Sequence, residues 1–159
     1  MAEVPASAVA ILKSLDTGMF LVEGRPPRGG ERQLAYAGSS QLFGGGIEPR
    51  ETALQAIGRE LREELGLWSV RPKFLWKGTY NHSQNKAGET VARPVHLFYV
   101  PIPTAVGLEM LVDGNIVYVS PQQEALATVQ PPLTRFALWA LTTALTIGVN
   151  KPWHSVSPN

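Results

Sequence analysis

The sequence predicts a single α/β domain in which a mixed sheet lies between helices, an α/β/α sandwich. Short apolar segments bounded by turn residues occur with two longer helical segments, 49–66 and 132–147, and this order favours strands packed between helices. A length of 159 residues fits one domain that buries roughly two-thirds of its unfolded surface. We therefore expect one domain over residues 1–159, with residues 148–159 as a loose tail.

Six segments are rich in apolar, β-branched or aromatic residues and are bounded by turn signals, which is typical of strands. They are residues 7–15, 19–23, 41–43, 70–80, 91–100 and 115–119. The turn signal at residues 16–18 joins the first two strands into a hairpin. The polar segment 81–89 joins the two longest strands into a second hairpin.

The first helix is predicted to begin near Pro49, where the fixed φ of proline is tolerated, and to end at Gly66. On a wheel of about 100° per residue its buried stripe consists of Leu54, Ile57, Leu61 and Leu65. Gly58 lies inside this helix and costs about 1 kcal/mol relative to alanine, which close packing against a strand would explain.

Two further helices are predicted near the C-terminus. Ser120 followed by proline resembles an N-cap that opens a short helix. The segment 132–147 forms a long helix whose apolar and aromatic positions contact the sheet, namely Leu133, Phe136, Trp139 and Leu145.

Glu60, Glu63 and Glu64 lie together on one side of the first helix. Residues three and four apart are neighbours on a helix, so these carboxylates share an arc roughly 100° wide beside the apolar stripe. Arg59 and Arg62 relieve part of their mutual repulsion, and a divalent cation would relieve more, because oxygen ligands suit Mg²⁺, Ca²⁺ and Mn²⁺. The spacing leaves two interpretations, a metal site that faces a cleft or a solvated acidic face.

The segment that carries these carboxylates resembles the signature of the Nudix family, G-x5-E-x7-R-E-U-x-E-E-x-G-U, in which U is bulky and apolar. The matching positions are Gly45, Glu51, Arg59, Glu60, Leu61, Glu63, Glu64, Gly66 and Leu67. No position departs from the pattern. The resemblance implies an α/β/α sandwich and an enzyme that hydrolyses a nucleoside diphosphate linked to another group.

The resemblance also implies a set of metal ligands. Glu60 and Glu64 match the main ligands of a divalent cation, Mg²⁺ or Mn²⁺. Glu63 matches either a third ligand or the base that deprotonates water. The backbone carbonyl at or next to Gly45 matches a further ligand.

Other positions receive supporting roles from the same resemblance. Arg59 orients or screens the glutamates. Glu51 would lie roughly 12 Å from Arg59 along a continuous helix, so no direct contact is predicted and its role is a structural one outside the metal ligands. Some family members take an additional base or ligand from a later loop, for which Asp113, Glu109 and Glu124 are the candidates here.

Substrate contacts are predicted for three residues. Arg25 and Arg28 lie in a segment rich in arginine, glycine and proline, which either binds phosphate groups through bidentate contacts or is a solvated connection. Tyr80 either stacks on a base or ribose or belongs to the amphipathic edge of the sheet. The residues do not identify which nucleoside triphosphate, dinucleoside polyphosphate or nucleotide sugar is cleaved.

Composition limits the remaining functions. A net charge of +1 argues against an extended nucleic-acid surface, although it permits a local phosphate pocket. The chain has no cysteine, which excludes thiolate chemistry and, with an N-terminus that lacks a basic region, favours a cytoplasmic protein. The longest apolar run is too short to cross a membrane. A nucleotide is the expected partner, a homodimer stays open, and a non-catalytic Nudix-fold binding module is the alternative function.

Overall fold

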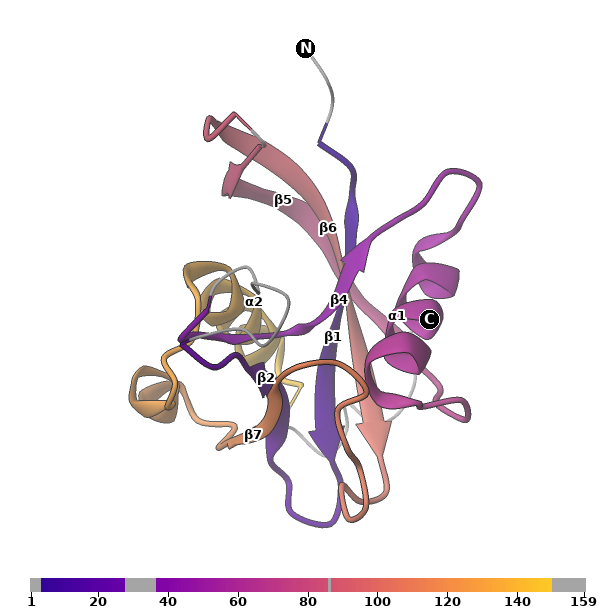
Figure 1. The fold of residues 1–159 in the computed structure, drawn as a ribbon, viewed down its shortest axis with the longest axis vertical. Helices are drawn as coiled ribbons and strands as arrows, with labels where there is room; N and C mark the ends of the chain where they lie inside the picture. Colours follow the sequence, from indigo (N-terminus) through magenta and orange to yellow (C-terminus); the bar gives the residue numbers. More distant parts are fainter. Residues whose placement is uncertain (1–3, 28–36, 86, 150–159) are drawn as a thin grey trace.

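The computed structural model describes residues 4–27, 37–85 and 87–149. Its strands are β1 (Ser7–Ser14), β2 (Phe20–Gly24), β3 (Ser40–Gln41), β4 (Phe43–Gly46), β5 (Lys73–Gln84), β6 (Thr90–Ile102) and β7 (Asn115–Val119). Its helices are α1 (Ala53–Leu65), α2 (Arg135–Ile147) and the 3-10 helix η1 (Gln123–Thr128). The helices α1 and α2 lie on opposite sides of a curled mixed sheet, which confirms the predicted α/β fold (Figure 1).

Strand β1 is the centre of the sheet. One of its edges pairs in parallel with β6 along its whole length, and β6 pairs with β5 in the predicted long hairpin. The other edge is divided between two antiparallel partners, because Leu12 pairs with Leu21 of β2 whereas Ala10 pairs with Phe43 of β4. The sheet therefore forks beside β1, with β4 on one branch and β2, together with β3 and β7, on the other.

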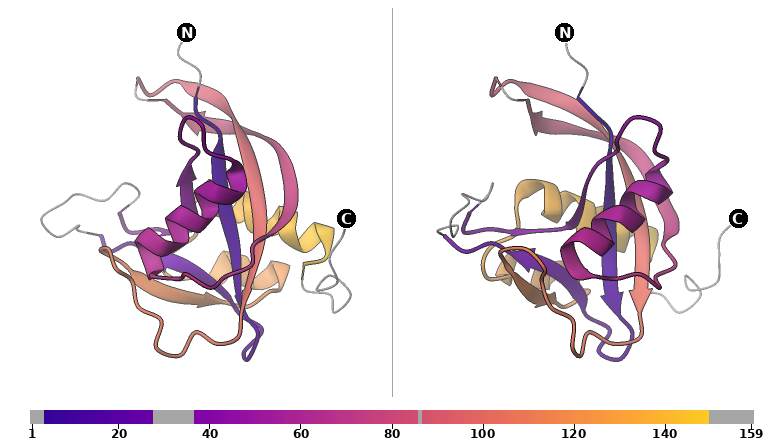
Figure 2. Two further views of the ribbon diagram at one scale, coloured as in Figure 1. Left: turned by 90° about the vertical axis from the view of Figure 1, so that its right-hand side faces the viewer. Right: turned by 45° about the vertical axis from the view of Figure 1, so that its right-hand side comes forward.

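Alternation along the strands separates two apolar cores, one under each helix, and Figure 2 shows the sheet between them. On the α1 face, Ala8 and Ala10 of β1 pack with Phe98 of β6 and with Ile57 and Leu61 of the helix. The α2 face contains Val9, Ile11, Phe20, Val22, Tyr80, Val95, Leu97, Tyr99, Ala137, Ala140, Leu141 and Ala144. The predicted contacts of Leu133, Phe136, Trp139 and Leu145 with this core are confirmed.

Helix α1 begins later than the sequence predicted. Pro49 lies in a turn before the helix, and Thr52 is the N-cap, with a capping box in which Thr52 and Gln55 bond each other's backbone. Gly66 ends the helix in the left-handed conformation, as predicted.

The predicted stripe of α1 is wrong at Leu54, whose side chain is 53% exposed, while Ala56, Ile57, Leu61 and Leu65 are buried. Leu54 points in the same direction as Leu61 but lies about 10 Å nearer the helix start, and a wheel records direction without showing where the covering elements end. Packing of a strand against Gly58 is also not found, since a Cβ atom there would meet only the end of the Arg62 side chain, at 3.4 Å.

The C-terminal helices differ from prediction mainly at their starts. The short helix is the 3-10 helix η1, which begins after Gln122 without a side-chain cap, so Ser120 is not its N-cap. Helix α2 begins after Thr134, whose hydroxyl accepts the backbone N–H of Ala137. Of the predicted tail, Gly148 is the C-cap of α2 and Val149 is buried, while residues 150–159 lie outside the described residues. Within the described residues, no helix combines the length and apolarity of a membrane span.

We expect Gly44→Ala to lower the free energy of unfolding by about 2 kcal/mol or more, because a Cβ atom there would lie 2.3 Å from the carbonyl oxygen of Ala8 and the backbone φ is +141°. Gly46→Ala is the matched control, since a Cβ atom at Gly46 meets nothing within 4 Å. Urea denaturation of both variants measures the difference. Equal loss of stability in the two variants would contradict the close approach of β4 to β1 at Gly44.

Candidate active site

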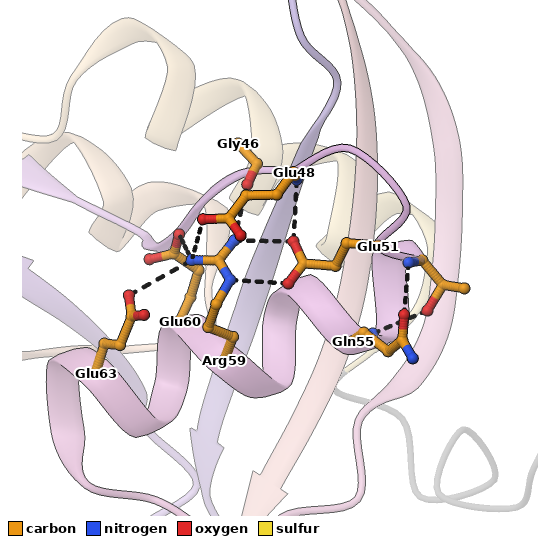
Figure 3. Close-up of polar contacts among 8 residues, drawn as sticks. Gly46, Glu48, Glu51, Gln55, Arg59, Glu60 and Glu63 are labelled. Carbon is orange, nitrogen blue, oxygen red and sulfur yellow. Dashed lines mark hydrogen bonds and ion pairs between the residues drawn. The ribbon is translucent and has the colours of Figure 1, made fainter.

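Arg59 of α1 is the centre of a network of carboxylates (Figure 3). Its guanidinium donates two hydrogen bonds to Glu51, from Nε at 2.8 Å and from Nη2 at 2.9 Å. Nη1 donates to Glu60 at 2.9 Å and to Glu63 at 3.4 Å, and Nη2 donates to the carbonyl oxygen of Gly46 at 3.0 Å. One arginine therefore joins the loop before α1 to two acidic residues of the helix.

The expectation that Glu51 lies far from Arg59 is wrong. Glu51 precedes the helix, and the loop from Gly46 to Glu51 folds back over the first turns of α1, which brings its carboxylate against the guanidinium. Hydrogen bonding to Arg59 lowers the pKa of Glu51 to about 2 and raises the pKa of Arg59. The estimate of about 12 Å was wrong because it assumed a continuous helix, and α1 does not include Glu51.

Arg62, the second arginine expected to screen the carboxylates, lies elsewhere. Its guanidinium lies over the ring of Trp68, 5.2 Å from the ring centre. The Arg59 side chain therefore supplies the ion pairs that the described structure shows to the glutamates of α1.

Glu60 lies directly against the glycine loop. A Cβ atom at Gly45 would fall 2.3 Å from Oε1 of Glu60, so only glycine leaves room for this carboxylate beside the backbone. The Glu60 side chain is 15% exposed, compared with 59% for Glu63. The structure thus brings Gly45 and Glu60 together and leaves Glu63 accessible to solvent.

Glu64 is half-buried between α1 and the sheet. Its Oε1 atom accepts a hydrogen bond from the backbone N–H of Gly44 at 3.3 Å. Burial, contact with the Glu60 carboxyl and the charge of Glu23 raise the pKa of Glu64 to about 8. The helix therefore presents one accessible carboxylate, one partly covered carboxylate and one that holds a proton near neutral pH in the absence of a cation.

Glu23 of β2 is an acidic residue of this region that the sequence did not single out. It is buried, and its carboxylate forms an ion pair with Arg25 at 3.3 Å. The residue stands at the end of an apolar strand, Phe20–Gly24, and a charged residue closing such a strand was the available signal.

The three additional acidic candidates lie in different places. The loop that contains Glu109 and Asp113 reaches the end of α1, where the backbone N–H of Leu111 donates to the carbonyl oxygen of Glu64 at 2.8 Å. Glu124 belongs to η1, which packs on the α2 side through Leu126. The fold thus brings the loop of Asp113 to the end of α1 that carries Glu64 and places Glu124 on the α2 side.

The three predicted substrate contacts also lie in different parts of the chain. Arg25 lies beside Glu23, and Arg28 lies outside the described residues. Tyr80 is buried on the α2 face, where its ring packs against Phe136 and Trp139 with ring centres 5.0 Å away in each case. This packing agrees with the structural interpretation of Tyr80, and stacking on a base stays a prediction.

The acidic side chains fit a hard divalent cation by their chemistry. Glu60 and Glu64 supply carboxylate oxygens in partly desolvated positions, and burial together with the neighbouring carboxyls of Glu60 and Glu23 raises the pKa of Glu64. Among residues 4–27, 37–85 and 87–149, no three acidic or histidine side chains already converge around one point as a finished cage. Arg59 donates to both Glu60 and Glu63 in this arrangement, so cation binding by these two carboxylates requires side-chain adjustment.

The sequence matches the family described as the NUDIX domain over residues 4–137. The chain belongs to the Nudix family. Nudix hydrolases generally hydrolyse pyrophosphate bonds in nucleoside diphosphate derivatives, and the complete signature between Gly45 and Leu67 places this chain among these enzymes. No curated relative matches the sequence.

Solved structures share the Nudix fold. The dihydroneopterin triphosphate pyrophosphohydrolase of E. coli is 17% identical with a TM-score of 0.63, covering 90% of this chain and 96% of that chain. The ORF135 protein of E. coli is 27% identical with a TM-score of 0.59, covering 92% of each chain. The NUDIX domain of Shewanella oneidensis NrtR, complexed with ADP ribose, is 14% identical with a TM-score of 0.65, covering 92% of this chain and 89% of that chain.

Glu64 makes the stability of the metal-free enzyme depend on pH. A carboxyl whose pKa is raised from 4.5 to about 8 binds its proton more tightly in the folded state. Its contribution to stability is complete below the unfolded pKa and is lost as the pH rises through the folded pKa. We therefore expect the wild type to lose thermal stability between about pH 5 and pH 8 relative to Glu64→Gln, which cannot ionise.

Thermal unfolding of both proteins in the presence of a chelator measures this difference. Glu63→Gln is the matched control, because Glu63 is exposed and should leave the pH dependence of the wild type unchanged. Parallel curves for the wild type and Glu64→Gln would show that Glu64 is not protonated in the folded protein.

Proposed function

We propose that this Nudix hydrolase is a divalent-metal-dependent enzyme that cleaves a pyrophosphate bond in a nucleoside diphosphate linked to another group. Nucleoside triphosphates, dinucleoside polyphosphates and nucleotide sugars are the substrate classes. The observation that carries the proposal is the pair of carboxyls of Glu60 and Glu64, held close together against the glycine loop, with Glu64 partly desolvated.

Glu60 and Glu64 are the proposed ligands of Mg²⁺ or Mn²⁺, with the backbone at Gly45 as a further ligand and Glu63 as either a third ligand or the base. A cation held there would neutralise phosphate oxygens and make an oriented water molecule more acidic. The helix fixes the backbone that carries these carboxylates, so cation binding requires only their side chains to adjust.

In the proposed reaction a water oxygen forms a bond to phosphorus as the bond from that phosphorus to the bridging oxygen breaks. The water proton passes to a carboxylate, and the bridging oxygen leaves on the departing phosphate with the bonding electron pair. Glu63 is the proposed base, since it is exposed and lies one residue from Glu64. Arg59 holds Glu60 and Glu63 through its Nη1 atom and is the proposed orienting residue.

Arg25 is the proposed phosphate contact, because its guanidinium reaches the side of the carboxylates and can bind phosphate oxygens in a bidentate manner. Arg28 has the same proposed role from the sequence alone. Tyr80 remains a proposed nucleoside contact, although its side chain is buried. A cytoplasmic location and a homodimer also stay predictions.

Glu64→Gln should lower turnover by orders of magnitude while the protein remains folded, since the amide has lost the charge that binds the cation. Turnover is measured as the release of phosphate or pyrophosphate from a panel of nucleoside diphosphate derivatives, with Mg²⁺ or with chelator. Glu89→Gln, in the exposed turn between β5 and β6, should keep wild-type turnover. Near wild-type turnover in Glu64→Gln would mean that the ligands are assigned incorrectly.

Cation binding at neutral pH should release protons. The pKa of Glu64 is about 8 without a cation, so the carboxyl is mostly protonated at pH 7 and must ionise to bind metal. We expect release of about one proton per ion bound, measured by calorimetric titration of Mn²⁺ in buffers of different ionisation enthalpy. An observed enthalpy independent of the buffer would be inconsistent with Glu64 as a protonated ligand.

A further inference from the structure

Glu23 occupies an unusual position for a carboxylate. It lies near the end of β2, paired with Ile116 of β7 on one side and with Gln41 of β3 on the other, and its side chain is 4% exposed. Side chains alternate along a strand, so Glu23 faces the same side of the sheet as Leu21, which packs in the core under α1. A buried carboxylate on this face needs positive charge or hydrogen bonds to offset its desolvation.

The fork in the sheet places Glu23 next to the proposed metal ligands. If β2 continued its pairing with β1, Glu23 would lie beside Ala10, but Phe43 of β4 takes that position. The two branches therefore separate there, and Glu64 reaches the fork from α1 to contact the backbone N–H of Gly44 on the β4 branch. The charge of Glu23 is one of the causes of the raised pKa of Glu64, which agrees with this proximity.

Gly114 makes room for Glu23 on the side opposite the fork. A Cβ atom at Gly114 would lie 3.1 Å from Oε1 and 3.2 Å from Cγ of Glu23, and the φ of Gly114 is +139°. The loop that ends at Gly114 also contacts α1, through the hydrogen bond from Leu111 to the backbone of Glu64. The same loop therefore packs against both carboxylate-bearing elements.

Arg25 is two residues beyond Glu23 and pairs with it on the same face, Nη2 to Oε2 at 3.3 Å. Glu23 and Glu60 border the fork with Glu64, and their ion pairs are with Arg25 and Arg59 respectively. Arg59 is shared among several carboxylates, so positive charge in the fork is scarce. Arg25 is also suited to phosphate groups, which compete with Glu23 for its guanidinium.

We propose that Glu23 is a positioning residue of the catalytic centre that holds Arg25 in the metal-free protein and releases it to a phosphate group of the substrate when a divalent cation offsets the Glu23 charge. This inference rests on the proposed function. A cation bound beside Glu23 would offset the charge of this buried carboxylate, and the guanidinium of Arg25 would then be free to bind the diphosphate. A pair that served only to stabilise the fold would not respond to the cation.

The first experiment measures Mn²⁺ binding by electron paramagnetic resonance in the wild type, Glu23→Gln and the control Glu89→Gln. Glu23→Gln keeps the shape of the side chain and removes its charge. We expect it to weaken Mn²⁺ binding by about ten- to a hundredfold, the range typical of residues that support metal ligands, and we expect the control to bind as the wild type does.

The second experiment follows the reaction of arginines with phenylglyoxal by peptide mass spectrometry, with and without Mg²⁺ and in the absence of nucleotide. In the wild type, Mg²⁺ should accelerate modification of Arg25 and leave the exposed Arg71 unchanged. Glu23→Gln should lose this dependence on Mg²⁺, with Arg25 reactive in both conditions. The wild-type measurement decides the point even where Glu23→Gln does not fold.

The outcomes separate the two proposals. If the wild type binds Mn²⁺ and Glu23→Gln binds it equally well, or if Mg²⁺ leaves Arg25 of the wild type unchanged, the inference about Glu23 is wrong and the proposed function stands. If the wild type binds no Mn²⁺, with or without nucleotide, both are wrong. Weakened Mn²⁺ binding in Glu23→Gln, together with Mg²⁺-dependent modification of Arg25 in the wild type, supports the proposed release of Arg25 from Glu23.

Discussion

The bidentate ion pair between Arg59 and Glu51 is the interaction on which the geometry of the site depends. It ties the loop between β4 and α1 to the middle of the helix, and the same guanidinium reaches the carbonyl oxygen of Gly46. The loop therefore has a fixed path beside Glu60, which needs the missing side chain of Gly45. Ion pairs and hydrogen bonds, rather than apolar packing, thus fix the conformation of this loop, since most of these groups lie at the edge of the packed interior.

Like-charged groups are concentrated where the sheet divides. In a continuous sheet β2 would stay paired with β1, but β1 exchanges β2 for β4 along one edge, so the two branches separate there. The half-buried carboxyl of Glu64 contacts the backbone of the β4 branch, and the buried carboxylate of Glu23 lies on the β2 branch. Desolvation of these carboxyls costs free energy of folding, as is common where a protein stores strain at a functional site.

Much of the fold could be predicted from the sequence, because strands such as Ser7–Ser14 are continuous apolar runs and α1 ends at a glycine. The error at Leu54 arose because a helical wheel carries no information about where neighbouring elements end. The contact between Glu51 and Arg59 was missed because it depends on a loop that reverses direction. Glu23 was missed because its environment is created by pairing between β1 and β4, far from it in the chain.

The two alanines of β1 on the α1 face, Ala8 and Ala10, are fully buried and carry the smallest side chains that a helix can pack upon. Small residues at this contact let the axis of α1 approach the strands closely, so the short reach of a glutamate suffices to touch the backbone of Gly44. Replacing them with bulkier residues would increase the distance between α1 and β1. All the glutamates of the helix would then move away from the strands. The size of the side chains at positions 8 and 10 therefore determines how far the glutamates of α1 lie from the strands.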